Sequence, residues 1–98
     1  MTVKEIKEKL KTSKNPVAKS FHNGEHFKVL LFGFNKGMKL NEHTASLPTK
    51  LLVIEGDVIY HQEKKDIRLK QFDEVEIPAG VTHSVAAISD SMVVLTQG

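Results

Sequence analysis

The chain has 98 residues, which is the size of one domain with a single modest core. Its formal net charge of +2 is too small to indicate a nucleic-acid-binding protein. The absence of cysteine excludes disulfides and thiolate chemistry. No apolar run approaches the roughly 18–20 residues that a membrane helix needs. We therefore expect one cytoplasmic domain over residues 1–98, with neither a membrane nor a nucleic acid as a partner.

Residues 1–16 are predicted to form a helical extension. Thr2 and Glu5 have the spacing of a capping box, in which each side chain bonds the other residue's backbone amide. Apolar residues recur at helical spacing on one face: Val3, Ile6 and Leu10. Asn15 before Pro16 favours a turn, so the helix should end before it. The lysines on the other faces indicate a solvated surface or, as the alternative, a basic arm for an acidic partner.

The rest of the chain has the pattern of short strands separated by turn residues, and we expect a β-barrel over residues 26–97. The predicted strands cover residues 26–34, 51–55, 58–60, 67–69, 72–77, 84–88 and 92–96. Turn residues separate them, as at 35–37, 56–57 and 78–80. About eight short strands with turns roughly every 8–12 residues are typical of an all-β sandwich or barrel. A jelly-roll barrel closed on itself would also leave few free strand edges.

Such a small barrel has little core to spare. Pairing with a second copy would cover a strand edge and bury more apolar surface. We therefore expect a homodimer.

Two of the five histidines, His43 and His83, stand close to turns where barrel strands are expected to start or end. Such positions face the mouth of a barrel, where small-molecule sites are usual. The other three, His22, His26 and His61, are expected at the surface or the rim.

The segment from Gly37 to Ala87 resembles the two sequence motifs of the cupin family. The first motif is glycine, five residues, His-any-His, a glutamate three or four residues later, and a glycine six residues after that. Here its matches are Gly37, His43 and Gly56. The second motif is glycine, five residues, Pro-any-Gly, two residues, histidine, three residues and asparagine. Its matches are Pro78, Gly80 and His83. The resemblance implies an all-β jelly-roll barrel of the cupin type.

The same resemblance implies a metal site, because three histidines and one glutamate of the motifs hold a divalent ion such as Zn, Fe, Mn or Ni in the family. In this chain the second histidine is replaced by Ala45 and the glutamate by Thr49. His43 and His83 are the ligands that remain. Side chains that could complete the site are His26, His61 and Glu42. One functional alternative is therefore a metal-dependent dioxygenase, isomerase or decarboxylase with an incomplete or unusual ligand set.

The other functional alternative is a metal-free pocket lined by His43, Thr49 and His83 that binds a small polar or anionic molecule. Imidazoles with a pKa near 6.5 suit such binding and suit proton transfer. The two histidines could also have only a structural role, and apolar side chains could fill the barrel interior. A sensor or interaction module is a third class, although the chain has no helix-turn-helix. The sequence assigns no catalytic residue and no ligand identity.

Overall fold

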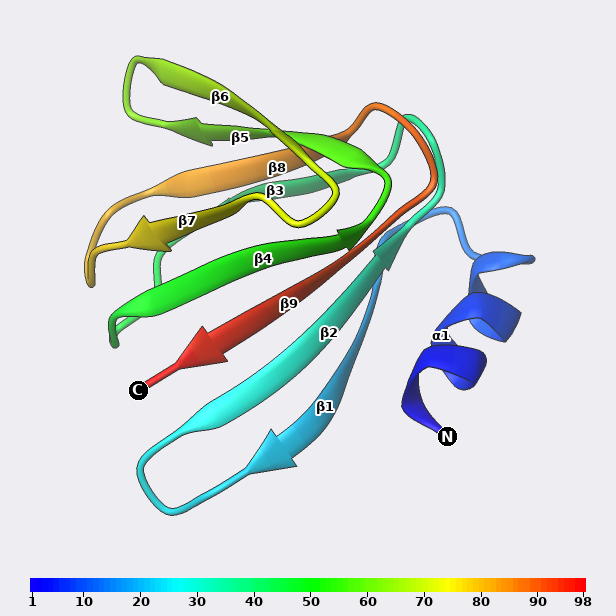
Figure 1. Cartoon of the computed structure of the whole chain (residues 1–98), viewed down its shortest axis with the longest axis horizontal. Coiled ribbons are helices and arrows are strands. Elements are labelled where there is room, and N and C mark those ends of the chain that lie inside the picture. Colours follow the sequence, from blue (N-terminus) through cyan, green and yellow to red (C-terminus); the bar gives the residue numbers. More distant parts are fainter.

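The computed structural model describes all 98 residues and consists of two antiparallel sheets with one helix. The elements are α1 (Thr2–Leu10), β1 (Val17–Asn23), β2 (Lys28–Phe34), β3 (Lys39–His43), β4 (Thr49–Glu55), β5 (Asp57–Gln62), β6 (Lys65–Lys70), β7 (Glu74–Ile77), β8 (His83–Ala87) and β9 (Ser91–Gln97). A five-stranded sheet has the order β1-β2-β9-β4-β7, and a four-stranded sheet has the order β3-β8-β5-β6. Figure 1 shows the two sheets facing each other, with the helix on the outer side of the larger one.

The core lies between the two sheets. Alternate residues of each strand point inward, so β4 buries Leu51 and Val53 while Lys50 and Leu52 face outward. Eleven buried apolar residues form one cluster: Phe34, Leu51, Val53, Val58, Tyr60, Leu69, Ile77, Val85, Ala87, Val93 and Leu95. This cluster is the main core of the molecule, and the buried polar residues Thr49, His83, Ser84 and Ser91 are not part of it.

Helix α1 covers part of the outer face of the five-stranded sheet. Its buried side chains Ile6 and Leu10 pack against Leu31 of β2 and Met92 of β9. Gly33 lies under the helix, where an added Cβ would approach Ile6 Cγ2 to 2.4 Å. A glycine at this point therefore lets the helix sit close to the strand. The helix has nine residues, and no helix here is long and apolar enough to cross a bilayer.

Several details of the sequence-based prediction were wrong. The helix begins one residue earlier than the capping box requires, with Met1 as its N-cap and no side-chain cap. The Glu5 carboxylate instead contacts Lys19 Nζ at 3.3 Å and the N-terminal amine at 3.5 Å. An additional strand, β1, lies before the predicted start of the barrel. Phe72 is not in a strand but in the turn between β6 and β7.

The predicted barrel closure is also absent, because no hydrogen-bonded strand pair joins the two sheets. The expected all-β jelly-roll architecture with an N-terminal helix is nevertheless present. The sandwich therefore has four edge strands: β1, β7, β3 and β6.

The packing of α1 gives a direct test of its contribution to stability. We expect Ile6→Ala to lower the free energy of unfolding by about 2–4 kcal/mol, because a fully buried side chain is replaced by a cavity. Val3→Ala is the matched control, since Val3 is 38% exposed and should cost well under half as much. Urea denaturation followed by circular dichroism measures both. Equal costs for the two variants would contradict the packing of α1.

Candidate functional site

His43 and His83 lie directly opposite each other across β3 and β8, on the inner side of the four-stranded sheet. A bulge between Leu40 and His43 shifts the β3 register, which keeps both residues on the face that packs against the core. Their ring centroids are 4.1 Å apart, with a 60° angle between the ring planes. His83 is 2% exposed and His43 is half-buried. The structure therefore brings together the two histidines that the sequence singled out.

Each of these rings is held by a hydrogen bond to backbone. His43 Nδ1 lies 3.0 Å from the Asn41 carbonyl oxygen, and His83 Nδ1 lies 3.1 Å from the Val81 carbonyl oxygen. A carbonyl only accepts, so each Nδ1 is the donor and each neutral ring has its lone pair on Nε2. Neither Nε2 has a partner within the protein. No buried side-chain nitrogen or oxygen lacks a partner, so both Nε2 atoms are reachable from solvent.

Two further polar side chains, Gln62 and Tyr60, belong to the same inner surface. Gln62 pairs with His83 across β5 and β8, so His43, His83 and Gln62 form a row over three adjacent strands. The hydroxyl of Tyr60 donates to Gln62 Oε1 at 2.6 Å, and the Tyr60 ring centroid lies 5.9 Å from that of His83. The sequence analysis missed both residues. The alternation of Val58, Tyr60 and Gln62 along one strand face was the signal that could have found them.

Burial favours the neutral forms of His83 and Tyr60. Burial lowers the pKa of His83 below 6.5, and the proximity of His43 lowers it further, against the opposing effect of the hydrogen bond to Val81. Burial also raises the pKa of the Tyr60 hydroxyl above 10. At neutral pH His83 is therefore an uncharged hydrogen-bond acceptor at Nε2.

Thr49, the third predicted pocket residue, lies on the inner face of β4, where it alternates with the core residues Leu51 and Val53. Its side chain is buried at the start of β4, and its hydroxyl donates to the Leu47 carbonyl oxygen at 3.1 Å. It lines a groove of about 480 Å³ together with Phe27, Lys28 and Ile77, and neither His43 nor His83 lines that groove. Thr49 therefore has its hydroxyl bonded to the local backbone, and no hydrogen bond joins it to the histidine pair.

The side chains that were considered to complete a metal site also lie apart from the pair. His61 points to the outer face of the four-stranded sheet, where its Nδ1 bonds the Asp66 carboxylate, and Glu42 lines the same outer hollow. His26 is exposed in the connection between β1 and β2, beside Glu25. The structure contains no group of three or more His, Cys, Asp or Glu side chains that could hold a metal ion.

Solved structures of cupins have the same arrangement of strands. A cupin superfamily protein from Desulfitobacterium hafniense is 18% identical over 87% of this chain and 78% of that chain, with a TM-score of 0.81. An RmlC-like cupin from Desulfovibrio desulfuricans is 24% identical over 85% of this chain and 81% of that chain, with a TM-score of 0.79. The chain has the cupin fold. KdgF from a Halomonas species is 19% identical over 88% of this chain and 81% of that chain, with a TM-score of 0.78. The sequence matches no family model, and no curated protein is significantly similar to it.

The cupin fold explains why the matched motif glycines occur where they do. Gly37, Gly56 and Gly80 have φ angles of +88°, +78° and +79°, a conformation in which L side chains are strained. The second motif begins with a glycine six positions before its proline, and Phe72 occupies that position here with a φ of +73°. The backbone of this chain therefore keeps the turn that the motif glycine would make, although the residue has changed.

The burial of His83 predicts a pH dependence of stability. The unfolded chain binds a proton at His83 near pH 6.5, whereas the folded chain does so only at a lower pH. Since the unfolded state then holds more protons, the free energy of unfolding should fall as the pH drops from 6.5 to 5, by at most about 1.4 kcal/mol per pH unit. Urea denaturation across this range measures it.

His83→Gln should flatten this dependence, and His26→Gln at an exposed position should leave it unchanged. The lowered pKa values of Glu5 and Asp57 also reduce stability as the pH falls, but mainly near and below their ordinary values of 4.5 and 3.8. A wild-type protein that gains stability between pH 6.5 and 5 would contradict the burial of His83.

Proposed function

We propose that the protein binds a small polar or anionic molecule at the open end of the sandwich, through the Nε2 atoms of His43 and His83. The observation that carries this proposal is the state of the two rings. Both are anchored at Nδ1 by backbone carbonyls, and both leave a solvent-accessible Nε2 without a partner in the protein. If the two rings had only a structural role, their hydrogen bonds at Nδ1 would be enough. There would be no need for two free Nε2 atoms beside each other.

The free Nε2 atoms of the two rings determine which groups the pair favours. When both rings are neutral, two adjacent Nε2 lone pairs accept hydrogen bonds, so they suit a hydroxyl, an amide N–H or a protonated acid. A carboxylate or other anion has no proton to donate, and its binding requires one of the rings to take up a proton. The affinity for anions should therefore rise as the pH falls below 6.5, because the proton becomes available.

The amide of Gln62 supplies the complementary donor. Its Oε1 already accepts from Tyr60, so its NH₂ group is left to donate to a ligand oxygen. Neither histidine lines any of the three main hollows of the surface. We therefore expect a ligand to place one functional group against the pair instead of being enclosed around it. A carboxyl group matches this arrangement, with one oxygen at Gln62 and the acid proton between ligand and imidazole.

A metal-dependent enzyme is the weaker alternative, because the donor set does not fit a resident divalent ion. Catalytic zinc typically has three protein ligands, and a non-haem iron site has two histidines and one carboxylate. Here the pair supplies two nitrogens, Gln62 Oε1 is occupied by Tyr60, and no carboxylate joins them. Metal removal should therefore leave both folding and ligand binding unchanged.

The binding proposal is tested with three probes of different chemistry: acetate, phosphate and glycerol. We expect saturable changes in the imidazole nitrogen shifts of His43 and His83 with at least one probe, at ligand concentrations up to about 10 mM. For an anionic probe the affinity should be higher at pH 5.5 than at pH 7.5. Long-range ¹H–¹⁵N correlation spectra measure both effects.

His43→Ala should weaken this binding at least about tenfold, which corresponds to roughly 1.4 kcal/mol for the lost hydrogen bond. His61→Ala is the matched control on the outer face of the same sheet and should bind like the wild type. If no probe shifts either ring, or if both variants bind equally well, the site assignment is wrong.

The metal alternative is tested by elemental analysis of protein dialysed against Zn²⁺, Mn²⁺ or Ni²⁺. We expect clearly less than one equivalent in the wild type and no further loss in His43→Ala. The double variant Ala45→His, Thr49→Glu restores the motif residues that this chain lacks and serves as the positive control, with an expected gain in bound metal. One tightly held equivalent of metal in the wild type that disappears in His43→Ala would make the metal-dependent enzyme the better supported of the two functions.

A further inference from the structure

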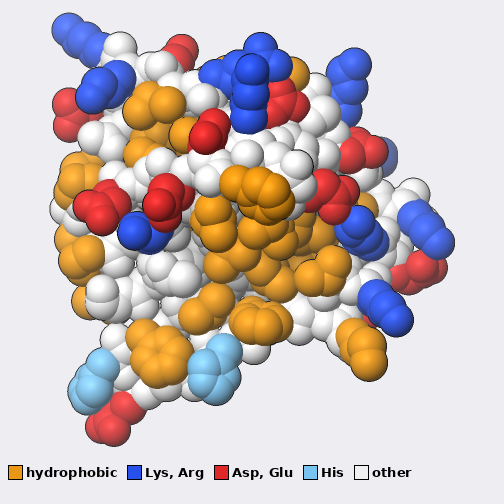
Figure 2. Space-filling view, viewed as in Figure 1, with side chains coloured by type: hydrophobic (Ala, Val, Ile, Leu, Met, Phe, Trp, Pro, Cys, Tyr) orange, Lys and Arg blue, Asp and Glu red, His pale blue; other side chains and the backbone are white.

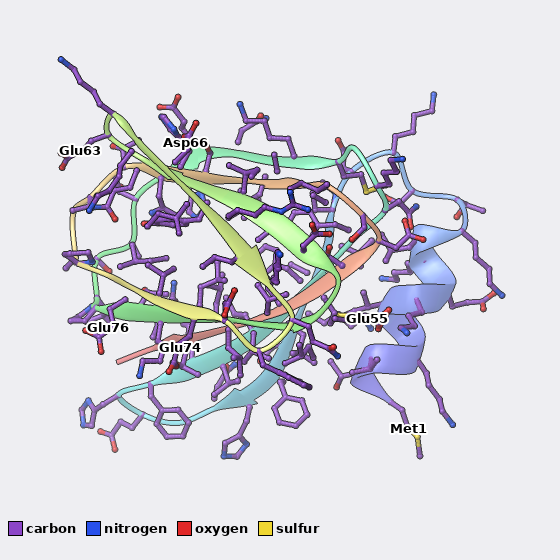
Figure 3. The ribbon with its side chains drawn as sticks, turned by 45° about the horizontal axis from the view of Figure 1, so that its top comes forward. Met1, Glu55, Glu63, Asp66, Glu74 and Glu76 are labelled. Carbon is purple, nitrogen blue, oxygen red and sulfur yellow. The ribbon has the colours of Figure 1, made fainter.

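The histidine pair and Gln62 present a defined pattern of hydrogen-bond acceptors and donors to a ligand. His43 and His83 each donate from Nδ1 to a backbone carbonyl, so each neutral ring offers the Nε2 lone pair as an acceptor. Gln62 lies beside His83 at the end of β5, next to Glu63, which Figure 3 labels at the tip of the β5–β6 hairpin. The site therefore combines two acceptors on adjacent strands with one amide group on the third strand.

Tyr60 determines which end of the Gln62 amide is left for the ligand. The Tyr60 side chain is fully buried, and its hydroxyl donates to Gln62 Oε1 at 2.6 Å. Burial raises the pKa of this hydroxyl, which therefore keeps its proton, and the protein offers that proton no other acceptor. An amide turned the other way would leave the buried proton unpaired, because an NH₂ group cannot accept it. The NH₂ group of Gln62 is thus the end that faces a ligand.

A primary carboxamide matches this pattern with all of its polar atoms. Its carbonyl oxygen accepts from the NH₂ group of Gln62, and its own NH₂ group has one hydrogen for each Nε2 of His43 and His83. Two acceptors that share one NH₂ group lie about 5 Å apart, because each is about 2.9 Å from the nitrogen and the two bonds diverge by about 120°. Rings whose centroids are 4.1 Å apart can place their Nε2 atoms at this separation.

Other small polar groups leave part of the pattern unpaired. A hydroxyl or a protonated carboxylic acid donates one hydrogen and so satisfies only one of the two rings. A carboxylate donates none. An ammonium group has enough hydrogens for both rings, but it meets the NH₂ group of Gln62, which is a donor as well. Of these groups, only the primary carboxamide brings two donors and one acceptor without first gaining or losing a proton.

The electrostatic surroundings also favour a neutral ligand group. Burial, the Val81 carbonyl and His43 account for the lowered pKa of His83, and no lysine, arginine or carboxylate contributes to it. Over the broad face of the molecule, positive and negative side chains are interspersed (Figure 2), and the whole chain has a net charge of only +2. A charged ligand would therefore find no counter-charge at the pair, whereas a neutral group avoids the cost of burying an unpaired charge.

From these observations we infer that the site selects a ligand with a primary carboxamide group, and that Tyr60 is the positioning residue that sets this selectivity through Gln62. The inference rests on the proposed binding at His43 and His83 and names the chemical class of the ligand. Without the Tyr60 hydroxyl, the Gln62 amide is free to turn and present Oε1, so that three acceptors face the ligand. Such a site favours an ammonium group, which supplies three hydrogens.

The first experiment compares acetamide, N-methylacetamide, N,N-dimethylacetamide and acetate as probes of the wild-type protein at pH 8, above the ordinary pKa of imidazole near 6.5. The imidazole nitrogen shifts of His43 and His83 report the binding of each probe. Acetamide should bind most tightly. Each N–H that a methyl group replaces should weaken binding at least about threefold, which is the effect of one lost hydrogen bond. Acetate should bind no better than N,N-dimethylacetamide.

The outcomes separate this inference from the proposed function on which it rests. If acetate, phosphate or glycerol shifts the two rings and acetamide binds no better than that probe, the carboxamide selectivity is wrong and the binding site stands. If N,N-dimethylacetamide binds as well as acetamide, the two imidazoles do not accept from the ligand NH₂ group, and the selectivity is again wrong. If no probe shifts either ring, both the site and its selectivity are wrong.

The second experiment tests Tyr60 by the ratio of the affinities for acetamide and methylammonium. Tyr60→Phe should lower this ratio at least about fivefold, because Gln62 can then turn Oε1 toward the ligand. Gln62→Glu keeps an acceptor for Tyr60 but removes the NH₂ donor, so it should reverse the preference even if Tyr60→Phe fails to fold. His61→Ala, on the outer face of the same strand, should leave the ratio unchanged. Circular dichroism checks the fold of each variant. Equal loss of both probes in the two test variants would show a structural role only and overturn the assignment of Tyr60.

Discussion

The register between β3 and β8 determines the chemistry of this protein, because it sets His43 opposite His83 with 4.1 Å between the ring centroids. A shift of one residue on either strand would turn one of the rings to the outer face. The bulge after Leu40 and the backbone carbonyls of Asn41 and Val81 fix both the position and the tautomer of the rings. The two imidazole contacts with the proposed ligand follow from these few backbone bonds.

The residues that the sequence could locate were those whose role depends on backbone conformation. Gly37, Gly56 and Gly80 were recognisable because a left-handed turn at these points excludes most other residues, and His43 and His83 follow them at fixed spacing. The alternation of apolar residues likewise placed most of the strands, since one face of each strand is buried in the core. These signals are local, so a single sequence is enough to show them.

The rest depended on contacts between distant segments. β1 has mostly exposed residues and no apolar alternation, and it is a strand only because β2 pairs with it. Tyr60 and Gln62 are ordinary strand residues until the β5–β8 register sets Gln62 beside His83. Phe72 reads as a strand residue by its type, but its backbone follows the turn of a motif glycine. Thr49 stands at the motif position of the glutamate, yet its hydroxyl donates to the carbonyl oxygen of nearby Leu47.

The most direct test of this account is the tautomeric state of the two rings in the free protein at pH 7.5. Long-range ¹H–¹⁵N correlation spectra distinguish a protonated from an unprotonated ring nitrogen. The structure predicts that both rings carry their proton on Nδ1, with an unprotonated Nε2 on each and a nuclear Overhauser effect between the rings. A proton on Nε2 of either ring, or rings with no magnetisation transfer between them, would contradict the proposed site.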